Sequence, residues 1–272
     1  MVDEINKELN KINQKFVDLN NQNNYLLNEI NTIKQLIINE NEYSFDLKNF
    51  CPICGEMSIF DSFGVNPRMN VKCPHCGSLE RHRLVYLFFQ RKYSYLLEHE
   101  NIKLLHFAPE TVFYNYFIKN NNIDYFPVDI DPNTYESRNI HIKQKVDMQD
   151  IPYGDNEFDF IYNCHVLEHI PDDIKSMGEL YRVLKEDGVC ITLVPQFNIE
   201  ETLEKEEYDT PELRRIYYGQ EDHLRKYGLD FKDKLESVGF NVEEVKAEDI
   251  IKSKTEKELY KLTNEVIYVC RK

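Results

Sequence analysis

The sequence predicts an α/β fold built on a parallel β-sheet and preceded by two smaller N-terminal parts. From residue 102 onward strand-like and helix-like segments alternate, which is typical of βαβ units. Two C-x-x-C-G motifs precede this region, and an apolar heptad repeat precedes the motifs. We therefore expect a helix over residues 1–42, a compact segment over 46–78, a connecting helix over 79–100 and the α/β domain over 101–272.

Composition narrows the class of protein. The chain has 272 residues, a net charge of −15 and 42% hydrophobic residues, enough to bury a sizeable core. The N-terminus has neither the basic start nor the apolar stretch of a signal peptide, and no apolar run is long enough to cross a bilayer. We therefore expect a cytoplasmic protein without a membrane span. The negative charge disfavours a nucleic-acid partner.

The first forty residues carry a heptad repeat. A seam this narrow is not buried by one isolated helix, so the repeat predicts a homo-oligomer formed through residues 5–37. The alternative is an amphipathic helix that packs on its own domain. Asn23 at an a position favours a parallel dimer, whereas isoleucine at d leaves a trimer open. The a positions are Leu9, Phe16, Asn23, Ile30 and Ile37, and the d positions are Ile5, Ile12, Leu19, Leu26 and Ile33.

Two cysteine pairs are the strongest chemical signal in the chain. The motifs CPICG and CPHCG contain Cys51, Cys54, Cys73 and Cys76. Their spacing is that of a zinc ribbon, in which four thiolates close a tetrahedral Zn²⁺ site. Since a closed site leaves no open coordination position, we expect a structural role for this metal.

A basic stretch surrounds the second cysteine pair and the connecting helix. Residues 64–92 contain Arg68, Lys72, Arg81, Arg83, Arg91 and Lys92 against Glu80 alone. One interpretation is a solvated helix face that balances acidic neighbours. The other is a site for a phosphorylated substrate or an anionic partner.

The α/β domain is predicted from periodicity. The expected strands are 103–107, 124–130, 158–163 and 189–194, and the expected helices are 111–119, 172–184 and 230–238. Gly188 follows the second helix, where we expect a chain reversal. Ligands of such sheets bind beyond the carboxyl ends of the strands. Asp129 lies there, at the distance from Glu110 at which nucleotide-binding folds place a carboxylate on ribose hydroxyls.

The stretch VDMQDIPYGDNEFDFIYNCHVLEHIPDD, residues 146–173, carries a family resemblance. It resembles the central signature of class I S-adenosylmethionine-dependent methyltransferases of the methyltransferase-11-like kind. This resemblance implies a Rossmann-like, seven-stranded sheet with helices on both faces. The cysteine motifs, followed by GSLERHR and LHFAPE, are similar to a bacterial subgroup often associated with surface-glycan biosynthesis.

The resemblance implies a set of cofactor contacts. The first loop contacts the methionine part, Asp129 the ribose and Asp147 the adenine amino group, with Met148 beside the ring. Asn163 and Cys164 follow the fourth strand near the methionine. The cofactor-binding residues expected in this way are His106, Phe107, Ala108, Pro109, Glu110, Asp129, Ile130, Asp147, Met148, Asn163 and Cys164.

The long connection over residues 196–229 is expected to form a substrate lid. It contains YYGQEDHLRKYG, which is dense in hydrogen-bonding groups. We expect His223 to act as general base with Asp222 beside it, and His165 is the second candidate for the base. Arg225, Tyr227 and Tyr218 are expected to contact the substrate. The alternative for this segment is a surface helix with satisfied polar groups.

These expectations favour an S-adenosylmethionine-dependent O-methyltransferase. Its expected substrate is a sugar or phosphate-bearing small molecule of surface-polysaccharide biosynthesis. One alternative is an RNA or protein methyltransferase that docks its substrate through the zinc ribbon. The other is a non-catalytic scaffold with a degenerate cofactor site, although Asp129 and Asp147 argue against it.

Overall fold

The structure is a computed structural model that describes residues 48–64, 67–94 and 101–272 together with part of the N-terminal segment. The described N-terminal positions are Lys11, Gln14, Lys15, Asp18, Leu19, Asn21, Gln22, residues 25–30 and Thr32. The chain divides into two compact units. One comprises residues 1–86 and 253–262, and the other comprises residues 87–252 and 263–272.

The larger unit is built on a seven-stranded sheet with the order β10-β11-β9-β8-β5-β6-β7. Six strands run in the same direction, and β11 is antiparallel to both of its neighbours. The strands are β5 (Ile102–Phe107), β6 (Ile123–Asp129), β7 (Gln144–Lys145), β8 (Phe158–Cys164), β9 (Leu184–Leu193), β10 (Asn241–Val245) and β11 (Ile267–Arg271). The predicted α/β fold with a seven-stranded sheet is confirmed.

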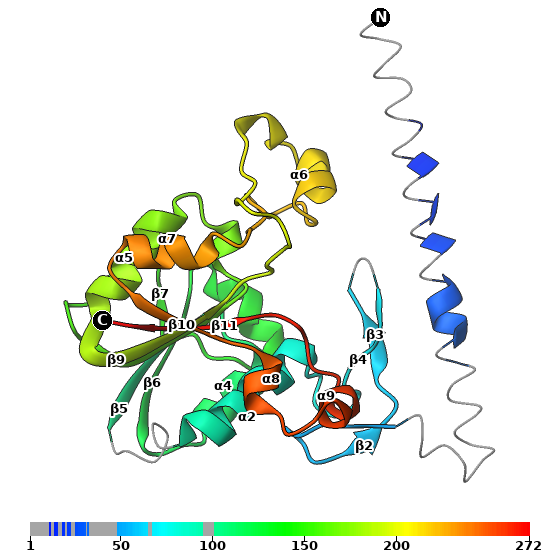
Figure 1. Ribbon diagram of the computed structural model, residues 1–272, viewed down its shortest axis with the longest axis horizontal. Helices are drawn as coiled ribbons and strands as arrows, with labels where there is room; N and C mark the ends of the chain where they lie inside the picture. The colour runs from blue at the N-terminus through cyan, green and yellow to red at the C-terminus, as the bar shows by residue number, and fades with distance from the viewer. Residues whose placement is uncertain are drawn as a thin grey trace, which may run out of the picture. The chain divides into compact units, whose positions relative to one another are not determined.

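Helices cover both faces of this sheet. In Figure 1, α5 (Asp173–Val183) and α7 (Phe231–Ser237) lie on one face and α4 (Thr111–Phe117) lies on the other. The helix α2 (Glu80–Lys92) crosses the boundary between the two units, and α8 (Ala247–Ile250) follows β10. Short 3₁₀ helices are η2 (Pro132–Arg138), η3 (Leu167–His169) and η4 (Glu206–Tyr208).

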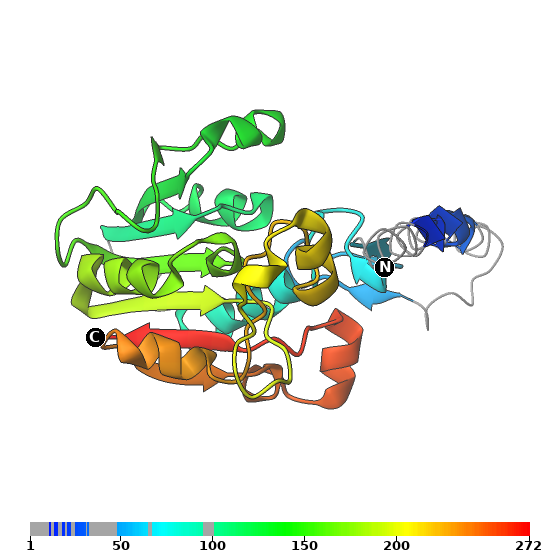
Figure 2. The ribbon, with the colours of Figure 1, turned by 90° about the horizontal axis from the view of Figure 1, so that it is seen from above.

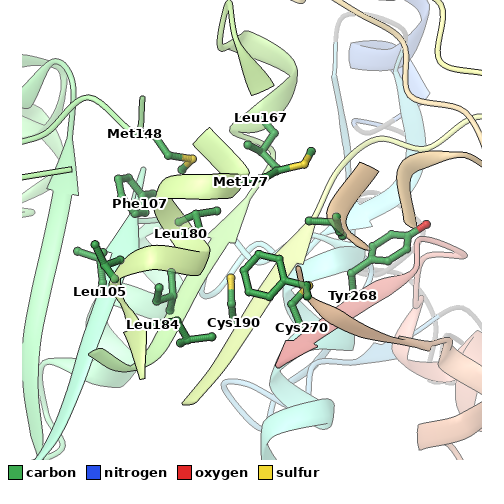
Figure 3. Close-up of a cluster of buried hydrophobic side chains, with 14 of the residues drawn as sticks. Leu105, Phe107, Met148, Leu167, Met177, Leu180, Leu184, Cys190, Tyr268 and Cys270 are labelled. Atoms are coloured by element: carbon green, nitrogen blue, oxygen red, sulfur yellow. The ribbon is translucent and has the colours of Figure 1, made fainter. Parts of the chain in front are cut away.

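The core between α5 and the sheet explains why this helix forms where it does. Asp172 caps the helix by accepting a hydrogen bond from the Lys175 amide at 2.9 Å. Met177 and Leu180 are fully buried, and Figure 3 shows their side chains among those of the neighbouring strands. Burying each of these side chains contributes roughly 1.5–3 kcal/mol, which holds the helix on the sheet.

Gly188 has a different role from the predicted one. The helix ends at Val183, and Gly188 lies inside β9, so the expected chain reversal at this residue is wrong. A β-carbon at this position would lie 2.8 Å from Leu184 Cδ1 and 2.9 Å from the Lys185 carbonyl oxygen. The glycine is needed because the strand passes close to its own preceding residues, where its pairing with β8 is irregular.

The order of the strands places the ligand site. The chain leaves β5 for β6 on one side and later returns to β8 on the other side. The loops after β5 and β8 therefore diverge, and the crevice between them is where open α/β sheets bind ligands. The connection over residues 196–229, which contains η4 and α6 (Pro211–Tyr217), lies beside this end of the sheet (Figure 2).

The smaller unit holds the two cysteine motifs. Each motif is followed or preceded by short antiparallel strands, and α9 (Lys254–Tyr260) belongs to the same unit. The strands are β1 (Asn49–Phe50), β2 (Met57–Ser58), β3 (Asp61–Phe63) and β4 (Arg68–Lys72).

A buried arginine joins the parts of the smaller unit. The Arg83 guanidinium donates to the carbonyl oxygens of Ser78, Val71, Tyr260 and Lys261 at 2.6–2.9 Å. It also lies over the Phe60 ring. One member of the basic stretch is therefore committed to internal contacts rather than exposed to a partner.

Most of the heptad repeat lies outside the described residues, and the predicted oligomer stays a prediction. Three of its positions are described. Leu19, Leu26 and Ile30 are helical, and 58%, 53% and 38% of their surfaces are exposed. Within the described part of the chain, no helix is long and apolar enough to cross a membrane.

Candidate functional site

A cavity of about 500 Å³ opens at the carboxyl ends of β5, β6 and β8. Its volume lies within the range of small-molecule sites, about 300–1,000 Å³. The lining residues are Phe107, Ala108, Asp129, Ile130, Tyr135, Arg138, Val146, Asp147, Met148, Gln149, His165, Val166, His169, Ile170, Pro171 and Asp222. Six of the eleven predicted cofactor-binding residues are among them.

The loop after β5 approaches the cavity through its backbone and its apolar side chains. Ala108 has a φ of +47°, in the left-handed region that glycine usually occupies. Its amide donates to the Val128 carbonyl at 3.0 Å, which ties the loop to β6. Because the side chain is only a methyl group, the loop can adopt this conformation and still leave room for a ligand.

The polar side chains of the same loop face the sheet rather than the cavity. His106 is fully buried, with Nδ1 2.7 Å from the Tyr125 hydroxyl and Nε2 3.1 Å from Glu110 Oε2. The Tyr162 hydroxyl donates to Glu110 Oε1 at 3.4 Å. Burial raises the pKa of the Tyr125 phenol, so this hydroxyl remains a donor. His106, Pro109 and Glu110 do not line the cavity.

Asp129 stands at the end of β6 with its carboxylate on the cavity wall. Its Oδ1 accepts from the Asp131 amide at 2.7 Å, and its Oδ2 accepts from the Tyr135 hydroxyl at 2.8 Å. Each carboxylate oxygen has two acceptor positions, so both can still accept from a ligand hydroxyl. The two local bonds fix the orientation of the carboxylate before any ligand arrives.

Asp147 also lines the cavity and is held in the same manner. Its Oδ1 accepts from the Gln149 amide at 2.9 Å and from the Gln149 side chain at 3.2 Å. Met148 is buried and presents an apolar wall beside it. By contrast, Asn163 and Cys164 are buried in β8, where Asn163 Oδ1 accepts from the Thr192 hydroxyl, and neither lines the cavity.

Histidines gather at the other end of the cavity. His165 follows β8 with a φ of +57°, and both it and His169 line the cavity. His165 Nε2 lies 3.4 Å from Glu265 Oε2, and its Nδ1 lies 3.7 Å from Glu168 Oε1. This end can therefore orient a nucleophile and accept its proton.

His223 lies behind this histidine layer rather than on the cavity wall. It is 3% exposed, and its ring packs edge-on against His169 with centroids 4.8 Å apart. Its Nδ1 lies 3.2 Å from the Tyr218 carbonyl oxygen. Burial is the main cause that lowers the pKa of His223 to about 4. Asp222, predicted as its companion, lines the cavity itself.

Arg225 and Tyr227, two of the predicted substrate contacts, are fully buried. The Arg225 guanidinium donates to the carbonyl oxygens of Leu167, Ile170 and Pro171 and pairs with Glu204 at 2.8 Å. The Tyr227 hydroxyl donates to Asp173 at 2.8 Å. These groups join the lid to η3 and α5, and neither lines the cavity.

A second cavity of about 560 Å³ lies under the lid and shares Pro171 with the first. Tyr218, the third predicted substrate contact, lines it. The other lining residues are Glu204, Lys205, Glu206, Tyr208, Asp209, Arg214 and Leu224. Three carboxylates line it against one lysine and one arginine, and Arg214 pairs with Asp209, so the lining suits a hydroxyl-rich group.

Sequence reasoning missed the segment after β6. Tyr135 and Arg138 of η2 line the cavity, and Asp131 caps this helix by accepting from the Asn133 amide. The signal was present, because Asp-Pro-Asn directly after a predicted strand is typical of a capped turn beyond its carboxyl end. Gln149, Val166 and Ile170 were missed for lack of a distinguishing pattern.

The four cysteines of the smaller unit form a compact cluster. Their sulfur atoms lie within 4.8 Å of one another, with Cys51–Cys76 at 3.6 Å and Cys54–Cys73 at 3.7 Å. A tetrahedral Zn²⁺ with bonds of 2.3 Å separates its sulfur ligands by about 3.8 Å. Gly55 and Gly77, with φ of +78° and +72°, close the two turns around the cluster. The cluster thus has the donor set and spacing that a structural zinc ion requires.

A family model described as a methyltransferase domain matches residues 110–192, the segment from α4 through β9. The chain is 33% identical over 116 residues to the sterol 24-C-methyltransferase of Schizosaccharomyces pombe. This match covers 39% of the chain and 28% of that protein. It is also 38% identical over 60 residues to the demethylmenaquinone methyltransferase of Staphylococcus carnosus. This match covers 22% of the chain and 24% of that protein. The chain thus spans about a quarter of the length of these curated relatives.

Solved structures with a similar fold include a methyltransferase from Archaeoglobus fulgidus described as S-adenosylmethionine-dependent. The two chains are 16% identical, with a TM-score of 0.47 over 70% of this chain and 93% of that one. The [4+2]-cyclase SpnF is also 16% identical to this chain. Its TM-score is 0.48, over 70% of this chain and 80% of the cyclase. Residues 110–192 thus carry a methyltransferase domain, and the sheet order and the cavity at its switch point fit this assignment.

Proposed function

We propose that the protein is an S-adenosylmethionine-dependent O-methyltransferase of a small, oxygen-bearing acceptor. The observation that carries this proposal is the polarity of the main cavity. One end presents the carboxylates of Asp129 and Asp147, and the other presents His165, His169 and Asp222. A nucleoside suits the first end, and a hydroxyl that must lose a proton suits the second.

The residues present fit the cofactor. Asp129 would accept from the two ribose hydroxyls, because its fixed carboxylate faces the cavity with free acceptor positions. Asp147 would accept from the adenine amino group, and Met148 and Ile130 would contact the ring. The backbone at Phe107 and Ala108 would approach the methionine end. The bound cofactor supplies an activated methyl group; the protein supplies alignment and proton removal.

His165 is better placed than His223 to take the acceptor's proton. It lines the cavity, and the carboxylates of Glu265 and Glu168 lie 3.4 and 3.7 Å from its two ring nitrogens. These contacts hold the ring in one orientation. We therefore assign the general base to His165. Arg225 and Tyr227 then act by holding the lid on η3 and α5.

The lining of the second cavity bears on the class of acceptor. The second cavity carries Lys205, Arg214 and two tyrosines together with three carboxylates, a polar lining that suits a hydroxyl-rich molecule such as a sugar. The assignment to surface-glycan biosynthesis rests on the resemblance of the cysteine motifs and the LHFAPE loop alone. The names of the curated relatives concern a sterol and demethylmenaquinone, and the chain covers only a quarter of those proteins.

We also assign a structural Zn²⁺ to Cys51, Cys54, Cys73 and Cys76. Four thiolates leave no position for a substrate or for water, so this ion would stabilise the smaller unit and take no part in methyl transfer. Its ligation would compensate for the small core that the motif-bearing segment can bury.

Calorimetry and a labelled-methyl assay test the proposal. We expect S-adenosylmethionine to bind the wild-type chain and Asp129→Asn to bind about tenfold or more weakly, the cost of a hydrogen bond to a charged group. Transfer to nucleotide-activated sugars should be lost in His165→Gln and retained in His141→Gln, which changes an exposed histidine of the same unit. Absence of cofactor binding would instead support a scaffold, and salt-sensitive transfer to RNA would support a nucleic-acid methyltransferase.

A further inference from the structure

A second group of potential metal ligands lies at the histidine end of the main cavity. The ligand atoms of Glu168, His169 and His223 lie within 4.8 Å of one another. Among the described residues, this group and the four cysteines are the two sets of three or more such side chains that approach so closely. It combines two imidazoles and one carboxylate.

Both histidines direct one nitrogen into this group and hold the other by an outer contact. His223 Nδ1 donates to the Tyr218 carbonyl, which leaves a lone pair on Nε2. This Nε2 is buried and has no hydrogen-bond partner among the described residues. A buried ring nitrogen without a partner is costly unless something absent from the structure binds it.

His169 is arranged in the same way. Its Nδ1 lies 3.2 Å from the Asp222 carbonyl oxygen and 3.4 Å from Asp222 Oδ2, and its Nε2 faces Glu168 Oε1 at 4.0 Å. Metal-bound histidines usually donate their second nitrogen to a carbonyl or carboxylate, which fixes the tautomer and the ring. Tyr218 and Asp222 provide such outer contacts for the two rings.

Glu168 brings a negative charge to the centre of the group. Its side chain is fully buried, and its Oε1 lies 3.7 Å from His165 Nδ1. A carboxylate at this place can serve as the third ligand of a cation beside the two imidazoles. The Glu168 carbonyl oxygen also accepts from the Leu224 amide at 2.8 Å, so the segment that carries His223 is tied to η3.

We propose that Glu168, His169 and His223 bind a divalent transition-metal ion at the acceptor end of the cavity. Two histidines and one carboxylate are three ligands, which leaves open coordination positions. Ligand atoms around such an ion lie about 3–3.5 Å apart, so the group must contract on binding. His169, whose side chain is 34% exposed on the cavity wall, is the ligand with room to make that adjustment, together with its exposed partner Asp222.

The ion would serve the acceptor, and this role rests on the proposed methyltransferase function. A hydroxyl bound to a divalent ion has a lowered pKa, so its proton passes more readily to His165. The oxidation state of the ion does not change. This chemistry favours acceptors whose hydroxyl lies beside a second oxygen, because two oxygens can fill the open positions together.

Cobalt titration of the full chain tests the site. The protein is first loaded with one equivalent of zinc, which the four thiolates bind in preference to the histidine group, and Co²⁺ is then added. We expect one equivalent of Co²⁺ to bind with ligand-field absorption and without thiolate-to-cobalt charge-transfer bands. Glu168→Gln and His223→Gln should each weaken binding at least tenfold, and His141→Gln should leave it unchanged.

Thermal unfolding and S-adenosylmethionine binding are measured on every variant, because Glu168 and His223 are buried. If either variant fails to fold, His169→Gln, which changes the exposed ligand, replaces it with the same expected loss. Absence of Co²⁺ binding, equal binding by all variants or charge-transfer bands alone would overturn the proposal. Since cofactor binding needs no metal at this site, failure here leaves the test of the methyltransferase function separate.

Discussion

The cysteine cluster takes its four ligands from two short motifs, whereas the histidine group takes its three ligands from η3 and from the lid, more than fifty residues later in the chain. Each cysteine pair is positioned by its own glycine turn. Glu168, His169 and His223 are brought together only when Arg225 and Leu224 bind the carbonyl oxygens of η3. The first group is closed and the second is open toward a cavity.

This difference explains what each group can do. A closed set of thiolates stabilises a unit too small to bury much core. A set that meets the cavity through His169 can hold an ion that also contacts a ligand, but its geometry depends on the packing of the connection over residues 196–229. The following predictions sharpen the comparison, from the largest expected effect to the smallest.

Removal of one thiolate should have the largest effect. We expect Cys73→Ser to lose its zinc and to unfold residues 48–78, since structural zinc sites contribute about 10–16 kcal/mol of binding energy. Zinc content and limited proteolysis check this outcome. Cys190→Ala, which changes a buried cysteine of the sheet, should retain the metal. Full zinc content in Cys73→Ser would contradict the assignment.

Loss of the lid arginine should disturb the histidine group but not the cysteine cluster. Arg225→Met leaves the Glu204 carboxylate and three carbonyl oxygens without their donor. We expect a loss of about 1–3 kcal/mol, typical of leaving buried acceptors without their donor. Denaturant unfolding measures it. The half-exposed Arg215, paired with Glu221 on the surface, provides the control, for which Arg215→Met should cost below about 1 kcal/mol. Equal losses would mean that Arg225 does not hold the lid.

Substitutions of the two carboxylates near the loop after β5 should differ in their effect on cofactor affinity. Glu110→Gln should change S-adenosylmethionine affinity by less than about twofold, because Glu110 faces His106 and Tyr162 rather than the cavity. Asp129→Asn should weaken it about tenfold or more. Calorimetry of both variants checks the contrast. A large loss of S-adenosylmethionine affinity in Glu110→Gln would show that the loop rearranges so that Glu110 contacts the cofactor.

The smallest effect concerns the loop that carries Asp147 and Gln149. The hydrogen bond from Arg182 is the main cause that lowers the pKa of Glu179, which also accepts from the Ile151 amide at 2.8 Å. The resulting stability is present above the unfolded-state pKa of glutamate, about 4.3, and is lost as the pH falls through the lower folded-state pKa. The Glu179–Arg182 pair is partly exposed, so we expect it to contribute less than about 1 kcal/mol to the free energy of unfolding.

The pH dependence of unfolding measures this contribution. Glu179→Gln should reduce the fall in the free energy of unfolding as the pH is lowered. At the lowest pH, the variant and the wild type should have the same free energy of unfolding. An acid limb identical to that of the wild type would remove this role from Glu179.

The sequence predicted the parts of the molecule whose signals are local. The strands β5, β6, β8 and β9 and the helix α5 were found from periodicity, within about five residues of their observed ends. The strand β7 has two residues and the β10–β11 pair is formed across 21 intervening residues, so neither has a distinctive local pattern.

The site was predictable to a similar degree. Asp129, Asp147 and Ala108 line the cavity, because the position after a strand places them there. Glu110 was expected beside them, but its contacts come from His106 and Tyr162, residues of adjacent strands whose pairing sets the direction of the side chain. The direction of the His223 ring likewise depends on a backbone carbonyl of the lid, which no sequence pattern specifies.

A crystal structure with bound S-adenosylhomocysteine is the most direct test of the central claim, that the cavity between the loops after β5 and β8 is the cofactor site. We predict ribose hydroxyls on the Asp129 carboxylate, adenine beside Asp147 and Met148, and the sulfur atom directed toward His165. A ligand bound elsewhere, or bound here without contact to Asp129, would contradict the account.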